Sequence, residues 1–406
     1  MEGHFGWVRK PEFGLRTKKQ TFIIPEYQMN KPGSVNDMTL TPANTNYIPA
    51  LDGFRGFAIL MVVCYHYFAF SEWTRFGWIG VDFFFVLSGY LITLQLIKKR
   101  GSQNFFLNFF RNRVLRILPL YFVALAGFYV MINFVVSAVT ARHFEFYNTN
   151  ALAFITMIQN FLFIQKGLPA QPHLIHLWSI AVEEQFYLLW PLLILLLPKK
   201  NAHLIIWFLL VPAVIGLRYL LYLYYPDIVL IQYFNTFCRF DSFLIGASVF
   251  FFSQRAGNSL INVKLVWALM AIIVICILAG TDSYKLTAVF FRTIGYSLIA
   301  GFAGCLIQLI VYHQPKTLIR IFSWKPIVNV GRISYGIYII HYPLYYFLVL
   351  YWNNKNPEIK INYPLAYSLI CGLVCFIFTY FLSWGSYKYF ESYFLQFKSR
   401  QFALEK

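Results

Sequence analysis

Ten long apolar segments constrain this chain more than any other feature of its sequence. Each has close to the roughly 20 residues that an α-helix needs to cross the hydrocarbon core of a bilayer. The segments lie at about 51–70, 76–97, 117–139, 178–198, 203–225, 233–253, 263–280, 286–312, 327–351 and 364–385. We therefore expect an all-α fold, a polytopic membrane protein with about ten transmembrane helices.

The composition excludes the common soluble classes. Hydrophobic residues make up 59% of the 406 positions and charged residues only 12%, well below the charged content of soluble domains. The net charge of +18 would suggest nucleic acid as the partner of a soluble protein, but here it has to be read by its position relative to the apolar segments. We expect membrane lipid around the chain and no nucleic-acid partner.

The charges between the segments predict the topology. Residues 1–48 are polar and basic and lack the apolar run of a signal peptide. Most of the 34 Lys and Arg residues fall on the same side as this stretch, which the positive-inside rule places in the cytoplasm. The apolar stretch at 151–165 is too short to span, so we expect a re-entrant or interfacial segment there. We expect a multi-pass protein of the plasma (bacterial inner) membrane, with a cytoplasmic tail (1–48), a membrane domain (49–390) and a short cytoplasmic C-terminal tail (391–406).

Ionisable side chains inside apolar segments are costly, and by default they indicate a polar cavity, a transport path or a catalytic site. Arg239 and Asp241 lie two positions apart and project to different helix faces, so each needs another partner. The full set is Asp52, Arg55, His66, Asp82, Glu183, Glu184, Arg239, Asp241 and His341.

Arg55 and His66 are expected on nearly the same face of one helix. Their eleven-residue separation corresponds to about 16.5 Å along the helix axis, and Asp52 is placed to pair with Arg55. Depth along the helices puts His66, Asp82 and Glu183 in one layer. Such a layer suits general acid/base work on a hydroxyl, and it suits a proton relay in a transporter equally well. Taken alone, His66 would more often be a packing histidine and Arg55 an interfacial arginine.

The basic stretch between the second and third segments contains a second candidate site. Arg113 and Arg116 have the spacing that puts two side chains on one helix face, just before Pro119 and Tyr121. Guanidinium groups bind phosphate oxygens bidentately, so a phosphorylated ligand such as acyl-coenzyme A would fit. The alternative is that these charges are only the positive-inside signal.

No pattern indicates a metal or a tightly bound cofactor. The six cysteines lie in apolar stretches without CxxC spacing, so we expect buried thiols instead of ligands or disulfides. His173 and His176 share a helical spacing but have no third ligand nearby.

Several motifs together resemble the acyltransferase 3 family of integral membrane acyltransferases. The resemblance covers roughly residues 46–390. Its motifs are Leu51-Asp52-Gly53-Phe54-Arg55-Gly56 with His66; Gly80-Val81-Asp82 with Phe84 to Tyr90; Arg113 to Tyr121; His176 to Tyr187; Arg239-Phe240-Asp241 with Gly246; and Ser334 to Tyr338 with His341-Tyr342-Pro343.

The resemblance implies transfer of an acyl group, often acetyl, from cytoplasmic acyl-coenzyme A to a hydroxyl of an extracytoplasmic or lipid-linked glycan. The alternative is a proton-coupled transporter or flippase of a glycolipid or acylated metabolite, although no inverted repeat is visible.

The hypothesis for the site assigns a role to each residue. His66 is the general base, Glu183 orients it or relays its proton, and Arg55 contacts the donor. The donor side is expected to contain Arg55, Arg113, Arg116 and Tyr121, and the acceptor side Asp82, Ser88, Trp178, Ser179, Gln185, Tyr187, Arg239 and His341.

Overall fold

The computed structural model describes residues 47–68, 72–98, 104–135, 144–198, 201–228, 230–253, 289–355 and 357–397. Every regular element in these ranges is a helix, as expected, and all of them belong to one compact unit. The predicted segment at 263–280 and nearly all of the predicted N-terminal tail lie outside the described residues.

The helices follow one another closely along the chain, and several α-helices continue into short 3₁₀ or π stretches, labelled η. In order they are α1 (Pro49–Tyr67), α2 (Glu72–Arg75), η1 (Phe76–Ile79), α3 (Gly80–Lys98), α4 (Phe105–Val130), η2 (Met131–Val135), α6 (Glu145–Thr149), α7 (Ala151–Ile155), α8 (Gln159–Lys166), η4 (Ile175–Leu177), α9 (Trp178–Leu196), α10 (Ala202–Ile205), η5 (Ile206–Leu210), α11 (Val211–Tyr224), α12 (Ile231–Phe234), α13 (Thr236–Ser253), η6 (Phe291–Gly295), α15 (Tyr296–Gln308), η7 (Leu309–His313), α16 (Lys316–Phe322), α17 (Lys325–Arg332), α18 (Ser334–Lys355), α19 (Pro357–Asn362), α20 (Pro364–Ser386) and η8 (Tyr387–Glu391).

Six helical stretches of the described part are long and apolar enough to cross a membrane, which makes this a membrane protein. They are Phe76–Lys98, Phe105–Val135, Ile175–Leu196, Ala202–Tyr224, Phe291–His313 and Pro364–Phe397. Helices α1, α13 and α18 occupy three further predicted segments but do not reach the same combination of length, hydropathy and low charge. The described residues therefore support six of the ten expected spans by this measure.

Two predicted boundaries were wrong. The segment at 327–351 is not one helix, because α17 ends at Arg332 and α18 begins at Ser334. Helix α4 begins at Phe105, well before the predicted start at 117. Arg113 and Arg116 therefore lie on a helix that continues through Pro119, and not in a loop.

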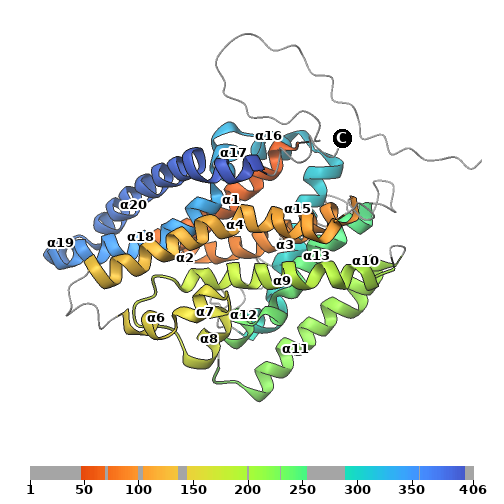
Figure 1. Cartoon of the computed structure of the whole chain (residues 1–406), viewed down its shortest axis with the longest axis horizontal. Coiled ribbons are helices and arrows are strands. Elements are labelled where there is room, and N and C mark those ends of the chain that lie inside the picture. The colour runs from red at the N-terminus through yellow and green to blue at the C-terminus, as the bar shows by residue number, and fades with distance from the viewer. Residues whose placement is uncertain are drawn as a thin grey trace, which may run out of the picture. The chain divides into compact units, whose positions relative to one another are not determined.

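The apolar stretch at 151–165 is not a membrane-crossing helix, in agreement with the prediction. It forms α7 and α8, which are separated by Met157 in a left-handed backbone conformation with φ of 55°. Helix α6 precedes them, and α8 lies beside α12 and α9 (Figure 1).

Helices α3 and α13 form the most extensive helix pair of the described residues and lie side by side (Figure 1). Their backbones approach closely at two glycines. A Cβ atom on Gly89 would lie 2.0 Å from the carbonyl oxygen of Phe243, and one on Gly246 would lie 1.9 Å from that of Val86. Any larger residue would force the two helices apart, which explains glycine at both positions.

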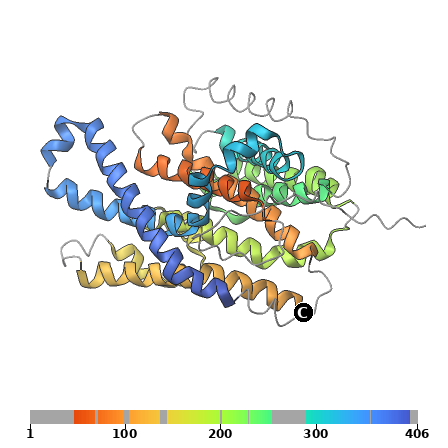
Figure 2. The same cartoon turned by 90° about the horizontal axis from the view of Figure 1, so that it is seen from above.

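Helix α1 packs against α17, α16 and α3, and its C-terminal end contacts α18. Helices α18 and α20 are joined by α19 into a hairpin that stands at one edge of the domain (Figure 1; Figure 2). Helix α4 crosses this region and contacts α18. The arrangement surrounds a central space with α1, α3, α4, α9 and α18.

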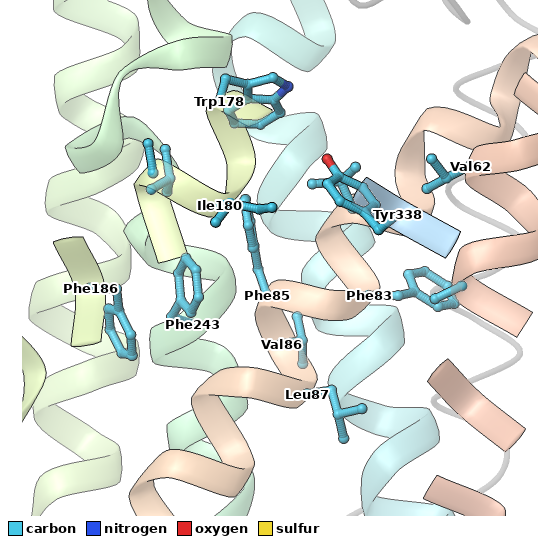
Figure 3. Close-up of a cluster of buried hydrophobic side chains, with 14 of the residues drawn as sticks. Val62, Phe83, Phe85, Val86, Leu87, Trp178, Ile180, Phe186, Phe243 and Tyr338 are labelled. Carbon is cyan, nitrogen blue, oxygen red and sulfur yellow. The ribbon is translucent and has the colours of Figure 1, made fainter. Parts of the chain in front are cut away.

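An aromatic stack fills the core beside that space. Phe186 stacks on Phe243 with ring centroids 4.3 Å apart, Phe243 stacks on Phe85 at 4.5 Å, and Phe85 meets the edge of Trp178 at 6.0 Å (Figure 3). These contacts join α9, α13 and α3. The five described cysteines are all free thiols, as expected.

Candidate active site

A cavity opens where α1, α3, α4, α9 and α18 meet. Its apolar lining includes Phe84, Phe85, Ile117 and Ile180. Its polar lining is Arg55, Ser88, Arg113, Arg116, Ser179, Glu183, Tyr187, Ser334, Tyr335 and Tyr338. Seven of the residues predicted for the site thus share one cavity although they come from four helices.

Three arginines dominate the charge of this cavity. Arg113 is nearly buried; its Nη2 donates a 2.7 Å hydrogen bond to Oε1 of Gln95, and its guanidinium lies 5.3 Å from the ring centre of Tyr187. Arg116, one turn further along α4, is half-buried, as the predicted spacing requires. Glu183 is the one carboxylate among the lining residues, so the cavity favours an anionic ligand.

Arg55 is held in place by an acidic neighbour on its own helix. Its Nη1 atom lies 2.6 Å from Oδ1 of Asp52, as the spacing predicted. Oδ2 of Asp52 accepts a 2.8 Å hydrogen bond from the hydroxyl of Tyr47, and Nη2 of Arg332 donates to the same hydroxyl at 3.2 Å. This hydrogen bond to Tyr47 raises the pKa of Arg332 and outweighs burial, which acts in the opposite direction. The network ties Arg55 to α17.

Glu183 organises two hydroxyl groups in the cavity. Its Oε1 accepts a 2.5 Å hydrogen bond from Oγ of Ser88 and a second, shorter one from the hydroxyl of Tyr187. The two hydroxyls are themselves 3.3 Å apart. A carboxylate with two donors on one oxygen fixes both side chains.

Tyr338 lies opposite this group. Its hydroxyl donates to the carbonyl oxygen of His176 at 2.8 Å and lies 2.5 Å from Oγ of Ser179. The Ser179 hydroxyl also donates to the same carbonyl oxygen at 3.3 Å. Together the two side chains connect α18 to the start of α9 at the edge of the cavity.

His66 is not among the residues that line the cavity, and its partner differs from the expected one. Its Nδ1 atom lies 2.9 Å from Nε2 of His341. Glu183 accepts its hydrogen bonds from Ser88 and Tyr187, so a role of Glu183 in orienting His66 or relaying its proton stays a prediction. The rings of His341 and Tyr338 are 5.6 Å apart, which brings the histidine pair near a residue that lines the cavity.

Comparison with known proteins identifies the family to which this chain belongs. The sequence pattern of an acyltransferase domain matches residues 48–384. The chain belongs to the acyltransferase 3 family. The family resemblance noted in the motifs is thereby confirmed, and the chain carries an acyltransferase domain in the membrane.

Relatives of this acyltransferase 3 domain are O-acetyltransferases. The chain is 29% identical over 400 residues to peptidoglycan O-acetyltransferase OatA of Listeria monocytogenes, covering 90% of this chain and 60% of that protein. It is 30% identical over 328 residues to O-acetyltransferase OatA of Staphylococcus aureus, covering 75% and 52%. It is 32% identical over 359 residues to the putative peptidoglycan O-acetyltransferase YrhL of Bacillus subtilis, covering 81% and 52%. The aligned part is thus about half to three fifths of the length of these relatives. No solved structure matches the chain.

Two predicted acceptor residues of the acyltransferase 3 domain form an ion pair outside the cavity. Nη2 of Arg239 lies 2.5 Å from Oδ1 of Asp82, and neither side chain has exposed surface. Asp241 pairs with Arg218 at 2.9 Å, also fully buried. The prediction that Arg239 and Asp241 each need another partner is confirmed. Asp82 and Arg239 do not line the cavity, so their expected place at the acceptor side stays a prediction.

The remaining predicted residues outside the cavity also have structural contacts. The Tyr121 hydroxyl donates to the carbonyl oxygen of Phe154 at 2.7 Å, which ties α4 to α7. The Gln185 amide donates to the carbonyl oxygen of Met157 at 2.9 Å. Trp178 is buried against the ring of Tyr233, with centroids 4.5 Å apart. None of the three lines the cavity, so their contact with a ligand stays a prediction.

His341 has no free nitrogen for a ligand. It is fully buried, and each ring nitrogen faces a protein atom. His176 is also buried and packs its ring 5.3 Å from that of His341.

Three polar lining residues were not predicted for the site: Ser334, Tyr335 and Tyr338. They belong to the motif Ser334 to Tyr338, which was quoted for the family resemblance, so the signal was present. The hydroxyl of Tyr335 donates to the carbonyl oxygen of Ile117 at 2.7 Å and thereby joins α18 to α4.

Proposed function

We propose that the protein is a membrane O-acyltransferase that moves an acyl group, most simply acetyl, from acyl-coenzyme A to a hydroxyl of an extracytoplasmic or lipid-linked glycan. The observation that carries the proposal is the meeting of Arg55, Arg113 and Arg116 with Ser88 and Glu183 in one cavity of an acyltransferase 3 domain. The relatives named as O-acetyltransferases supply the acetyl group as the first donor to test.

The arginines are the proposed site for the phosphates of coenzyme A. Arg113 has a nearly buried guanidinium whose Nε makes no hydrogen bond, so it has capacity for an anionic oxygen. Arg116 presents its charge on the same side of α4. Arg55 lies across the cavity on α1, where the Asp52 contact fixes it. Guanidinium groups in these positions neutralise phosphate and hold the donor in one orientation.

His66 is the proposed general base. It takes the proton of the acceptor hydroxyl while the hydroxyl oxygen attacks the thioester carbonyl, and the thiolate of coenzyme A leaves. His66 is half-buried, whereas His341 is fully buried. Glu183 then acts through the two hydroxyls that it fixes, not through His66 directly. Ser88, Ser179 and Tyr187 are the proposed contacts to the reacting groups.

The proposed orientation has both ends of the chain in the cytoplasm of a bacterial inner membrane, with coenzyme A arriving from that side. The excess of Lys and Arg in the loops on that side supports it. Direct transfer to the acceptor requires the fewest groups. No resident metal or cofactor is part of the proposal.

The acceptor follows from the relatives only as a class. Two of them are named for peptidoglycan, so a peptidoglycan hydroxyl is the first acceptor to test and other surface glycans are the next.

The test compares cells that carry the wild-type gene, a deletion, His66→Ala or His313→Ala. Mass spectrometry of peptidoglycan, surface glycans and lipids is expected to show an acyl mass increment with wild type and with His313→Ala, whose histidine lies in η7 away from the cavity. The increment is expected to be absent with the deletion and with His66→Ala at equal expression.

An increment that persists in His66→Ala would remove His66 from the mechanism. No increment with wild type, combined with no labelled acetyl transfer by the purified chain in liposomes, would favour transport.

A further inference from the structure

We propose that His341 is a positioning residue that fixes the tautomer of His66, so that the lone pair of the His66 ring lies on Nε2. The inference rests on the proposed function, because it explains how His66 is made ready to act as a base. It gives a buried histidine of α18 a role that differs from substrate binding.

The proton position on His341 follows from its carbonyl partners. Its Nδ1 atom lies 2.7 Å from the carbonyl oxygen of Tyr338 and 3.0 Å from that of Ile337. A carbonyl oxygen only accepts, so Nδ1 must carry the proton. The ring has no exposed surface, and an isolated charge would be costly there. A neutral His341 with its proton on Nδ1 has only a lone pair on Nε2.

The proton position on His66 follows in turn. Nε2 of His341 can only accept, and it lies 2.9 Å from Nδ1 of His66. His66 therefore donates through Nδ1, and in a neutral ring its Nε2 atom is left unprotonated. The assignment comes from the hydrogen-bond partners of the two rings, which form one directed line from His66 to the backbone of α18.

The packing holds the two rings in this relation. The hydroxyl of Tyr67, next to His66 on α1, donates to the carbonyl oxygen of His341 at 2.8 Å. The Tyr342 ring meets the His66 ring at an interplanar angle of 72°, with centroids 4.4 Å apart. The accessible member of the pair is His66, which is half-buried, whereas His341 is sealed.

The chemical consequence concerns one proton. The acceptor O–H proton moves to Nε2 of His66 as the new C–O bond forms and the C–S bond of the thioester breaks, and the thiolate recovers the proton from His66. During the step the His66 ring is positively charged, and its Nδ1–H still donates to His341. In the other tautomer of His66 the lone pair lies on Nδ1 and faces His341, so the ring offers no base to the acceptor hydroxyl. The rate of acyl transfer would then fall, whereas binding of the acyl-coenzyme A donor would not weaken.

The test uses a pair of matched amides. In His341→Gln the amide lies near the place of Nε2 and can accept from His66, whereas in His341→Asn it lies near the place of Nδ1 and cannot reach His66. Purified full-length variants in liposomes are assayed with acetyl-coenzyme A and the acceptor found for wild type. We expect His341→Asn to lower kcat roughly 100- to 10,000-fold, and His341→Gln to retain activity within roughly tenfold of wild type. The KM for acetyl-coenzyme A should stay within about twofold in both.

Two controls separate positioning from general disruption. Tyr67→Phe removes the neighbouring hydrogen bond to α18 but leaves both imidazoles, so its kcat is expected to fall less than about fivefold. His66→Ala combined with His341→Asn should be no slower than His66→Ala alone, because the two residues act as one unit.

The outcomes are distinct. Equal kcat for His341→Asn and wild type would overturn the positioning role, as would equal losses in His341→Asn, His341→Gln and Tyr67→Phe. Full activity of His66→Ala would overturn it together with the base assignment. A wild-type chain without acyl transfer, but with normal acetyl-coenzyme A binding, would refute the proposed function itself.

Discussion

Asp82 and Arg239 form a 2.5 Å ion pair that has no contact with solvent. One residue comes from α3 and the other from α13. Ser242 adds a 3.1 Å hydrogen bond to the same carboxylate oxygen, and the Arg239 guanidinium lies 3.9 Å from the ring centre of Tyr296. The pair therefore lies where α3, α13 and α15 meet, and it takes the place of part of the apolar contact between these helices.

Breaking this pair is expected to destabilise the domain. Asp82→Ala leaves a buried guanidinium without its partner, which costs about 3–5 kcal/mol. The double variant Asp82→Leu with Arg239→Met removes both charges and should recover most of that loss. Thermal unfolding in detergent measures both. Normal stability of Asp82→Ala together with a raised acceptor KM would instead return Asp82 to the substrate site.

The arginines on α4 are expected to govern donor affinity. Removing a charged hydrogen-bond donor costs about 1.5–3 kcal/mol, so Arg113→Ala and Arg116→Ala should each raise the KM for acetyl-coenzyme A about 10- to 100-fold. Arg320→Ala is the matched control, because Arg320 is an exposed arginine of α16 that does not line the cavity. Donor saturation that is unchanged in both α4 variants would contradict the phosphate assignment.

Ser88 and Tyr187 are expected to act as a coupled pair. Both donate to one oxygen of Glu183, so either hydroxyl partly compensates for loss of the other. A double-mutant cycle on kcat/KM with Ser88→Ala and Tyr187→Phe should give a coupling free energy of about 0.5–3 kcal/mol. Ser334→Ala, which alters a lining hydroxyl on α18, should show no coupling to Tyr187→Phe. Strict additivity of Ser88→Ala and Tyr187→Phe would show that the shared oxygen does not connect them.

The stability of the domain is expected to fall in mild acid because of His173. This residue lies between α8 and η4, outside the candidate membrane helices, and burial lowers its pKa to about 4. The unfolded chain binds the proton near pH 6.5, whereas the folded chain does so only near pH 4. The free energy of unfolding therefore decreases as the pH falls through this interval, by up to about 1.4 kcal/mol per pH unit.

His173→Phe should remove this part of the acid dependence. The ring of His173 is enclosed by Phe144 and Phe347, with centroids at 5.0 and 4.5 Å, so a phenylalanine suits the site. Thermal unfolding at about pH 7 and about pH 5 measures the slope. An equal slope in the variant and in wild type would assign the acid sensitivity to other groups.

Local spacing predicted those parts of the site that depend on one helix. The Asp52–Arg55 pair and the common face of Arg113 and Arg116 follow from helical periodicity. The same reasoning required separate partners for Arg239 and Asp241.

Relations between helices were not predictable in the same way. Depth along the membrane placed His66 and Glu183 in one layer, but depth says nothing of the direction in which each helix face points. The packing of the helices places His341 beside His66, and Glu183 accepts a hydrogen bond from Ser88. The break at Ile333 was missed because the one proline of the run 327–351, Pro343, lies inside α18 and not at the break.

The close approach at Gly89 and Gly246 has a mechanical consequence. Two helices whose backbones touch, with interdigitated side chains on either side, cannot slide or separate without breaking that contact, so α3 and α13 must move as a single rigid body. Ser88, the neighbour of Gly89, is carried on that body. Any widening of the cavity that admits a bulky acceptor must therefore come from the other helices that line it, α1, α4, α9 and α18. A crosslink between α3 and α13 would leave turnover intact.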